Sequence, residues 1–187
     1  MMPIRWLKGL TKAENEAHVS DKLVLLFFHS SKCGGCRKTE SMTFADGHVT
    51  ELIEKCCAPV SLDVTADQGL TAHYKIEWTP TFILADSSGV ELERWVGFLP
   101  PEDFIPQLYL AIGLSSFHRG LFKEAETAFE RIIDNHTTSV AAPQARYYMG
   151  VALYKATGDA SHLKRTWEAM SRRFPNDFWT KKASAWS

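Results

Sequence analysis

Two cysteines in the tetrapeptide Cys33-Gly34-Gly35-Cys36 are the side chains of this sequence best suited to chemistry. A cysteine at the first turn of a helix faces unpaired backbone N–H groups and the positive end of the helix dipole, and both stabilise a thiolate. Lys32 and Arg37-Lys38 add positive charge on either side of the pair. We therefore expect Cys33 to have a lowered pKa and to act as a nucleophile. Cys36, one turn further on, is placed to resolve a mixed disulfide on Cys33.

The C-x-x-C spacing also occurs at metal centres and in pairs that do no chemistry. A zinc site needs four ligands, and the sequence has no second C-x-x-C or H-x-x-x-H pair to complete it. An iron–sulfur cluster shared between two chains needs further thiols. A buried, inert pair is the remaining alternative. We therefore expect no metal and no bound cofactor, because a dithiol carries its electrons on its own sulfur atoms.

Composition excludes several classes of protein. The 187 residues are 45% hydrophobic, with 21 basic and 22 acidic side chains, so no net charge favours nucleic acid or acidic lipid. The longest apolar run, Leu23 to Phe28, is too short to span a membrane. The N-terminal residues show no secretory signal pattern. Four cysteines are too few for a disulfide scaffold in a chain of this length. We expect a cytoplasmic protein with no nucleic-acid or membrane partner.

The elements around the pair follow an alternating α/β order. Residues 23–28 are continuously apolar, as in a buried strand, and they end just before the cysteine motif. An amphipathic helix is predicted over residues 6–19 and further helices from Arg37 onward and around residues 49–53. Strands are predicted over 60–64 and 82–85, and 90–96 completes a hairpin. This order predicts a mixed central sheet flanked by helices.

A proline directly before a strand marks a second functional segment, Trp78-Thr79-Pro80-Thr81. Proline cannot donate to a strand ladder, so its place there calls for an explanation. A cis Thr79–Pro80 bond provides one, because it presents the backbone of Thr79 as a short edge for an extended peptide. Trp78 either covers the cysteine pair or is a core aromatic at the start of the strand.

After about residue 100 the strand pattern disappears and helical pairs follow. The periodicity predicts helices over residues 103–118, 121–135, 140–157 and 160–173, with a short one after Pro175. Gly113 and Gly150 stand 37 residues apart, which fits a repeated helical hairpin in which glycine lets two helices approach closely. We predict an α/β domain over residues 1–105 and an all-α helical-hairpin repeat region over residues 106–187.

The order of the motifs resembles a thioredoxin fold over about residues 5–110. The resemblance rests on Lys32-Cys-Gly-Gly-Cys-Arg37 after a buried strand and on Ile76-x-x-x-Pro80-Thr81-Phe82, followed by Gly89 and Gly97. The segment Cys36-Arg-Lys-Thr-Glu40 is similar to a thioredoxin-like subgroup with a C-x-x-C-[KR]-x-x-E helix. The resemblance implies exchange between Cys33, Cys36 and the disulfides of proteins or peptides. It also implies substrate contacts at Thr79, Pro80 and Trp78, and a thioredoxin reductase or another thiol donor as electron source.

Three positions depart from that family. Lys32 stands where many thioredoxins have Trp, and Phe27 stands where they have a buried acid that helps to deprotonate the resolving thiol. Pro59 lies near the place of the lysine that partners this acid. His29 and Glu40 are the candidates to replace the acid.

The second half resembles tetratricopeptide repeats. Tyr109 and Arg146 occupy the place of the early Trp of that repeat, and Pro175 matches its late Pro, where Thr137 stands in the first copy. The resemblance implies that the helical tail selects a protein partner or pairs two copies of the chain.

Two functions of different classes therefore remain. One is a thiol–disulfide oxidoreductase whose tail binds a partner. The other is an adaptor or chaperone-like protein that uses the helical repeats on an inactive thioredoxin scaffold. A peroxide-reducing enzyme ranks last, because the sequence around Cys33 lacks the Thr, Pro and Arg setting of that chemistry.

Overall fold

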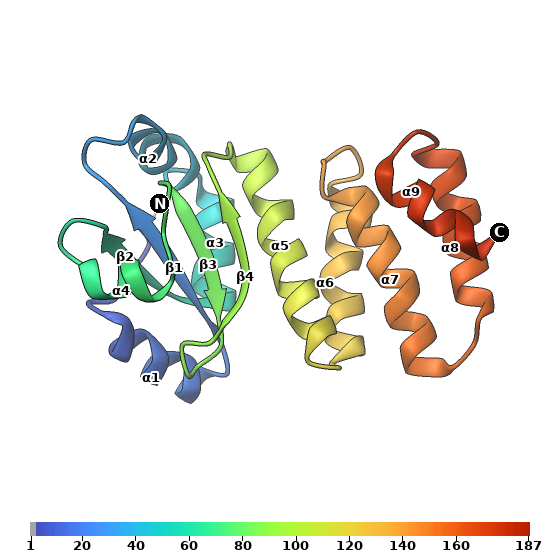
Figure 1. Ribbon diagram of the computed structural model, residues 1–187, viewed down its shortest axis with the longest axis horizontal. Coiled ribbons are helices and arrows are strands. Elements are labelled where there is room, and N and C mark those ends of the chain that lie inside the picture. The colour runs from blue at the N-terminus through green and yellow to red at the C-terminus, as the bar shows by residue number, and fades with distance from the viewer. Residues whose placement is uncertain (1–2) are drawn as a thin grey trace. The chain divides into compact units, whose positions relative to one another are not determined.

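The computed structural model describes residues 3–187 and divides into two compact units, Met1–Ile105 and Pro106–Ser187 (Figure 1). The first unit alternates helices and strands in the predicted order. Its helices and strands are α1 (Leu10–Ser20), β1 (Leu23–His29), α2 (Gly34–Lys38), α3 (Gly47–Cys56), β2 (Cys57–Asp63), α4 (Gln68–His73), β3 (Thr81–Ala85) and β4 (Glu91–Val96), with a π-helical turn η1 (Thr39–Thr43) between α2 and α3.

The sheet of the first unit has the strand order β2-β1-β3-β4. Strands β1 and β2 are parallel, whereas β3 is antiparallel to both β1 and β4. The mixed sheet flanked by helices that the sequence predicts is therefore confirmed. Strand β2 lies at the edge, and its Pro59 is tolerated there because an edge strand needs fewer backbone donors. The cysteine motif therefore follows a central strand whose five inner residues are all buried.

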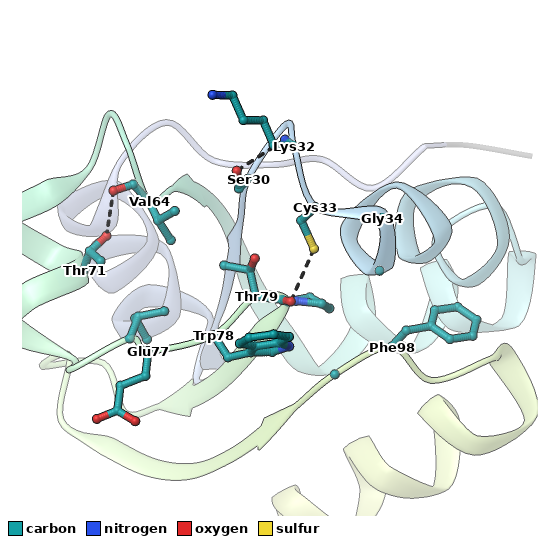
Figure 2. Close-up of a pocket in the computed structure, with 14 residues that line it drawn as sticks. Ser30, Lys32, Cys33, Gly34, Val64, Thr71, Glu77, Trp78, Thr79 and Phe98 are labelled. Carbon is teal, nitrogen blue, oxygen red and sulfur yellow. Dashed lines mark hydrogen bonds between the residues drawn. The ribbon is translucent and has the colours of Figure 1, made fainter.

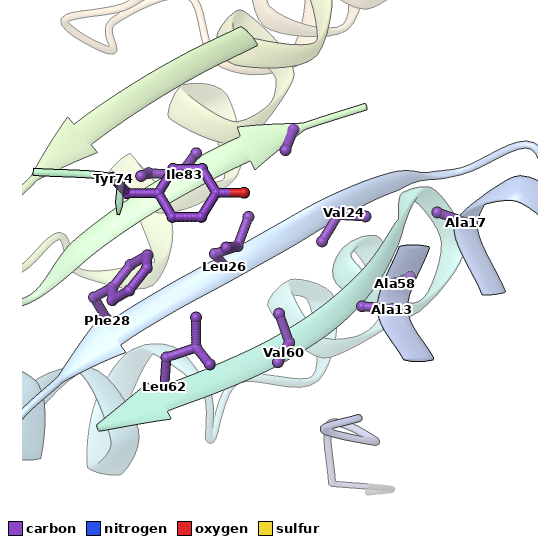
Figure 3. Packing of buried hydrophobic residues seen from close by; sticks show 11 residues of the cluster. Ala13, Ala17, Val24, Leu26, Phe28, Ala58, Val60, Leu62, Tyr74 and Ile83 are labelled. Atoms are coloured by element: carbon purple, nitrogen blue, oxygen red, sulfur yellow. The ribbon is translucent and has the colours of Figure 1, made fainter. Parts of the chain in front are cut away.

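Alternate residues of β1 face opposite sides of the sheet. Val24, Leu26 and Phe28 belong to a core shared with α1, β2 and β3 (Figure 3). On the other face, Phe27 stacks on Phe82 and meets Phe44 edge to face. Both faces of β1 are therefore covered by packed apolar side chains, which agrees with its continuous apolar run.

The opening helix is shorter than predicted. The apolar pattern favours a helix over residues 6–19, but α1 begins at Leu10, after Gly9 in a left-handed conformation with φ 88°. Leu7 instead forms an isolated bridge with Val60, and its N–H donates to the Pro59 carbonyl at 2.8 Å. Apolar side chains before Gly9 thus join the core from an extended segment, which periodicity alone does not distinguish from a helix.

Helix α5 (Pro101–His118) leads the chain into the second unit, whose further elements are α6 (Phe122–Asn135), α7 (Ala142–Thr157), α8 (Ser161–Arg173), α9 (Phe178–Ala183) and a 3₁₀ turn η2 (Ser184–Trp186). The four long helices end at the predicted residues and begin within two residues of the predicted starts. No helix within residues 3–187 has the length and apolar character that a membrane crossing requires.

Two glycines let the helices of the second unit pack closely, as expected. A Cβ atom on Gly113 would lie 2.4 Å from Phe129 Cε1, and one on Gly150 would lie 2.2 Å from Thr166 Oγ1. Both separations are far below van der Waals contact, so neither position accepts a larger residue without displacing its neighbour. Phe129 and Thr166 are 37 residues apart, like the two glycines, so the repeat aligns Phe129 with Thr166.

Candidate redox site

Cys33 lies at the end of the loop after β1 and caps helix α2. Its Sγ accepts a hydrogen bond from the Cys36 N–H at 3.1 Å, as a side chain at the N-cap position does. The Cys33 thiol in turn donates to the Thr79 carbonyl at 3.3 Å (Figure 2). Cys33 is partly exposed, and all four cysteines of the chain are free thiols. The sulfur is therefore accessible and surrounded by hydrogen-bonding groups.

The pKa of Cys33 is lowered from its ordinary value of 9.0. Burial alone would raise this pKa, but hydrogen bonds from the side chains of Cys36 and Thr79 and from the backbone of Cys36 and Gly35 outweigh it. The neighbouring basic side chains are not among the main causes, and Arg37 instead donates to the Ser31 carbonyl at 3.0 Å. Hydrogen bonding, rather than the basic flank emphasised in the sequence, therefore stabilises the thiolate.

Cys36 has the opposite character. Its side chain is buried, with 1% exposed, inside the first turns of the helix. Burial, and to a smaller extent the hydrogen bond to Cys33, raise the pKa of Cys36 to about 11. The two thiols of one motif thus differ in both access and acidity, so only Cys33 meets solvent as a nucleophile.

The Thr79–Pro80 peptide bond is cis, as the proline before β3 led us to expect. The Pro80 carbonyl accepts a hydrogen bond from the Gly97 N–H at 2.8 Å, which ties this segment to the loop after β4. The Thr81 hydroxyl donates to the Trp78 carbonyl at 2.8 Å. One backbone hydrogen bond and one hydroxyl–backbone hydrogen bond therefore fix the residues on either side of Thr79, which lies against Cys33.

An open pocket of about 650 Å³ surrounds this pair of segments. It brings together Cys33, Thr79, Pro80 and Trp78, which the sequence analysis selected from two distant motifs. Trp78 is 71% exposed, so it belongs to the pocket wall and not to the core, which settles the alternative left open above. Cys36 does not line the pocket and lies beneath it.

Phe98 is a pocket residue that the sequence analysis did not select. It follows β4 and lies under Lys38, whose Nζ is 4.5 Å from the ring centroid. Figure 2 shows Trp78 next to Thr79 and Phe98 farther along the pocket, on the side of Gly34. The neighbouring Gly97 was the one sequence feature near Phe98 that could have drawn attention to it. Nothing local to Phe98 indicates that the end of β4 approaches the cysteine motif.

No acidic side chain replaces the missing buried acid at the positions proposed from the sequence. Phe27 is buried within an aromatic cluster, with its ring stacked on His29 at 5.1 Å between centroids. Glu40 is exposed on the helix surface, so it does not supply a buried carboxylate. His29 is half-buried at the end of β1 and carries no carboxyl group. The space of the acid is thus filled by apolar rings.

Cys56 and Cys57 form no second redox site of this kind. Cys56 ends α3, and Cys57 is buried at the start of β2. Burial raises the pKa of both thiols. Within the described part of the chain, no three His, Cys, Asp or Glu side chains are grouped so that they could hold a metal ion.

Comparisons with known proteins agree with the fold. A family model described as a thioredoxin-like domain matches residues 10–111, more than half of the chain. Thioredoxin Y2, chloroplastic, of Arabidopsis thaliana is 33% identical over 89 residues, which are 48% of this chain and 51% of that protein. The chain therefore matches only about half the length of this curated relative.

Solved structures show the same similarity. A thioredoxin from Thermus thermophilus is 28% identical, with a TM-score of 0.51 over 57% of this chain and 85% of that one. A putative disulphide-isomerase from Bacteroides thetaiotaomicron shares the fold, at 22% identity and a TM-score of 0.53 over 59% of this chain and 93% of that one. With the family model covering the sheet, the cysteine pair and the cis proline, the chain belongs to the thioredoxin-like family.

Proposed function

We propose that the chain is a thiol–disulfide oxidoreductase that acts on protein or peptide disulfides through Cys33 and Cys36. One observation carries this proposal: the accessible Cys33 sulfur has a lowered pKa and lies 3.3 Å from the Thr79 carbonyl, above a buried second thiol. A thiol that ionises more readily than a free cysteine, a resolving thiol and a backbone edge for the substrate are the three parts that disulfide exchange needs.

The reaction begins when the Cys33 thiolate attacks one sulfur of the substrate disulfide. A bond forms between Cys33 Sγ and that sulfur, and the second substrate sulfur leaves as a thiolate. Cys36 then loses its proton and attacks Cys33 Sγ, which forms the Cys33–Cys36 disulfide and releases the first substrate sulfur. The substrate gains two electrons and the protein loses two. A thiol donor, such as a thioredoxin reductase, returns the pair to the dithiol, and the reverse sequence oxidises a dithiol substrate.

Substrate binding is assigned to Thr79, Pro80 and Trp78. An extended peptide can pair with the backbone at Thr79, which lies beside the reacting sulfur. Trp78 and Phe98 offer aromatic surface in the same pocket, and such rings supply much contact energy at a small loss of conformational freedom. We assign partner recognition to the helical unit and place the protein in a reducing compartment such as the cytoplasm, where both thiols stay reduced.

The adaptor alternative rests on Phe27. Because aromatic rings fill the place of the buried acid, no carboxylate there helps Cys36 to lose its proton. An inactive pair would follow if Cys36 could not resolve the mixed disulfide. The experiment below distinguishes the two functions at this step.

The test is a redox titration of the full chain against defined glutathione ratios, read by alkylation mass and Trp fluorescence. A reversible two-electron couple that disappears in Cys33→Ser supports the oxidoreductase. Cys36→Ser provides the matched control, because it should accumulate a mixed disulfide on Cys33 with a peptide disulfide substrate. If the wild-type chain shows no reversible couple, or if Cys33→Ser titrates in the same way, the oxidoreductase proposal is wrong and the adaptor function is favoured.

A further inference from the structure

A second pocket lies within the helical unit, apart from the cysteine motif. Its volume is about 190 Å³, and it lies among the end of α6, the first turns of α7 and the end of α8. The residues that line it are Ile133, Thr137, Ala142, Arg146, Arg173 and Phe174. It thus combines two guanidinium groups with a largely apolar wall.

Arg146 is the unusual residue of this pocket. Its side chain is half-buried, and burial lowers its pKa, an effect that the charge of Asp134 only partly offsets. Within residues 3–187, its guanidinium makes no side-chain hydrogen bond or ion pair. A guanidinium has five N–H donors, and withdrawing them from water without a partner costs free energy. An external acceptor would offset this cost.

Arg173 adds a second positive charge to the same cavity. It lies at the end of α8, is exposed, and has no ion-pair partner among the described residues. Two like charges that face one cavity repel each other, so an anion between them is favoured. Arg146 and Thr137 stand where the repeat resemblance leads one to expect Trp and Pro, so these features belong to this chain and not to the repeat in general.

The size and the walls of the pocket restrict the anion. Pockets for drug-sized ligands start at roughly 300 Å³, so a cavity of about 190 Å³ suits a smaller group and excludes a nucleotide. Ile133, Ala142 and Phe174 form the apolar part of the wall. A bare phosphate would leave this wall in contact with its hydration shell, whereas a short aliphatic group would cover it. The planar guanidinium fork matches a carboxylate in two-point hydrogen bonding.

We propose that this pocket binds a carboxylate carried on a small apolar group. Arg146 and Arg173 hold the carboxylate, and Ile133, Ala142 and Phe174 receive the apolar group. Two sources present this chemistry: a free aliphatic carboxylic acid, and the C-terminal residue of a peptide chain that ends in an aliphatic side chain. The inference does not depend on the redox proposal, because none of these residues lines the pocket at Cys33.

The test is an amide NMR titration of the isotope-labelled full chain with N-acetyl-leucine. We expect saturable shift changes at Thr137 and Ala142, and a dissociation constant weakened at least about tenfold in Arg146→Gln and in Arg173→Gln, since each removes a charge-assisted hydrogen bond. Arg172→Gln is the matched control. It removes the same charge from an exposed neighbour outside the pocket and should leave affinity within about twofold.

The uncharged amide of N-acetyl-leucine and inorganic phosphate complete the comparison. Equal binding of the amide would show that no carboxylate is recognised, and equal binding of phosphate would show that the apolar wall has no role. Either result overturns the proposal. A loss of affinity in Arg172→Gln as large as in Arg146→Gln would overturn it too. A peptide that ends in leucine and 4-methylpentanoic acid separate the two sources. At least tenfold tighter binding of the peptide supports a chain end as the ligand, and equal binding supports the free acid.

Discussion

The difference in acidity between Cys33 and Cys36 leads to a prediction about their rates of alkylation. Iodoacetamide reacts with the thiolate, so each rate reports the ionised fraction and the access of one sulfur. The pKa of Cys33 lies below 9.0, whereas that of Cys36 is raised to about 11. We expect Cys33 to react much faster than Cys36 at neutral pH, and the structure sets a lower limit on the ratio.

The limit follows from the two pKa values. At pH 7, a thiol with a pKa of about 11 is ionised to roughly one part in ten thousand, and one below 9 to more than about 1%. The ratio of thiolate fractions is therefore at least about 100. A less acidic thiol gives a more nucleophilic thiolate, because the logarithm of the rate rises by about 0.4–0.5 per pKa unit. Over two units this reduces the advantage of Cys33 by nearly a factor of ten. The rate ratio is then at least about tenfold, before the burial of Cys36 adds to it.

The assay follows the mass of the chain and of its peptides after timed alkylation between about pH 5 and 10. Cleavage after Lys32 and Arg37 leaves both cysteines in one peptide, so fragment spectra and the variants Cys33→Ser and Cys36→Ser assign each rate. The Cys33 rate should rise with pH and reach half of its maximum below pH 9, because the pKa of Cys33 lies below 9.0. The hydrogen bond from the Cys36 side chain lowers the pKa of Cys33. Because Cys36→Ser changes this bond, the pH at which the Cys33 alkylation rate is half-maximal should shift.

Two results would refute this reasoning. One is alkylation of Cys36 at a rate equal to that of Cys33 at pH 7. The other is a Cys33 rate that reaches half of its maximum at pH 9 or above, because the hydrogen bonds from Cys36 and Thr79 would then not stabilise its thiolate.

Three further substitutions test the packing and the pocket. Replacing Phe27 by Asp introduces a charge into the buried aromatic cluster and should lower the free energy of unfolding by about 3–5 kcal/mol in urea denaturation. The change Phe27→Leu should cost less, and equal losses would contradict the packing argument. Gly113→Ala places a Cβ 2.4 Å from a Phe129 ring atom and should cost about 1–3 kcal/mol, whereas Gly69→Ala, in open space, should cost nothing. A neutral Gly113→Ala would mean that α5 and α6 are not in close contact. Trp78→Ala should leave thermal stability unchanged, since Trp78 is 71% exposed, but raise KM for a peptide disulfide about two- to tenfold in an insulin-type reduction assay. An unchanged KM would remove Trp78 from the substrate site.

Local patterns made much of this fold predictable. The buried strand before Cys33, the helix that starts at the motif and the proline before β3 each depend on a few neighbouring residues. The ends of the four long helices also follow from periodicity and from turn residues such as Gly120 and Gly158. The start of α1 was missed because Gly9 adopts a positive φ while the apolar pattern continues on both sides of it.

Contacts between distant segments required the tertiary structure. Phe98 reaches the pocket only because the loop after β4 returns to the cysteine motif, and Trp78 is exposed because the chain turns outward before Pro80. The repeat equivalence of Phe129 and Thr166 became visible only from their approach to Gly113 and Gly150. Side-chain types do not encode such distances, since each depends on how separate elements pack.

The sequence by itself therefore determined which chemistry we propose for this protein, and the tertiary structure decided how the two cysteines differ in access and acidity. The types and spacing of Cys33, Cys36 and Pro80 indicated thiol chemistry, because the reactivity of a thiol at the start of a helix depends largely on local groups. The structure assigned the lowered pKa to hydrogen bonds from Cys36 and Thr79 and the raised pKa to burial of Cys36. Both effects arise from groups brought together only by folding, and the electrostatic environment of a thiol depends on those groups and not on its neighbours in the chain.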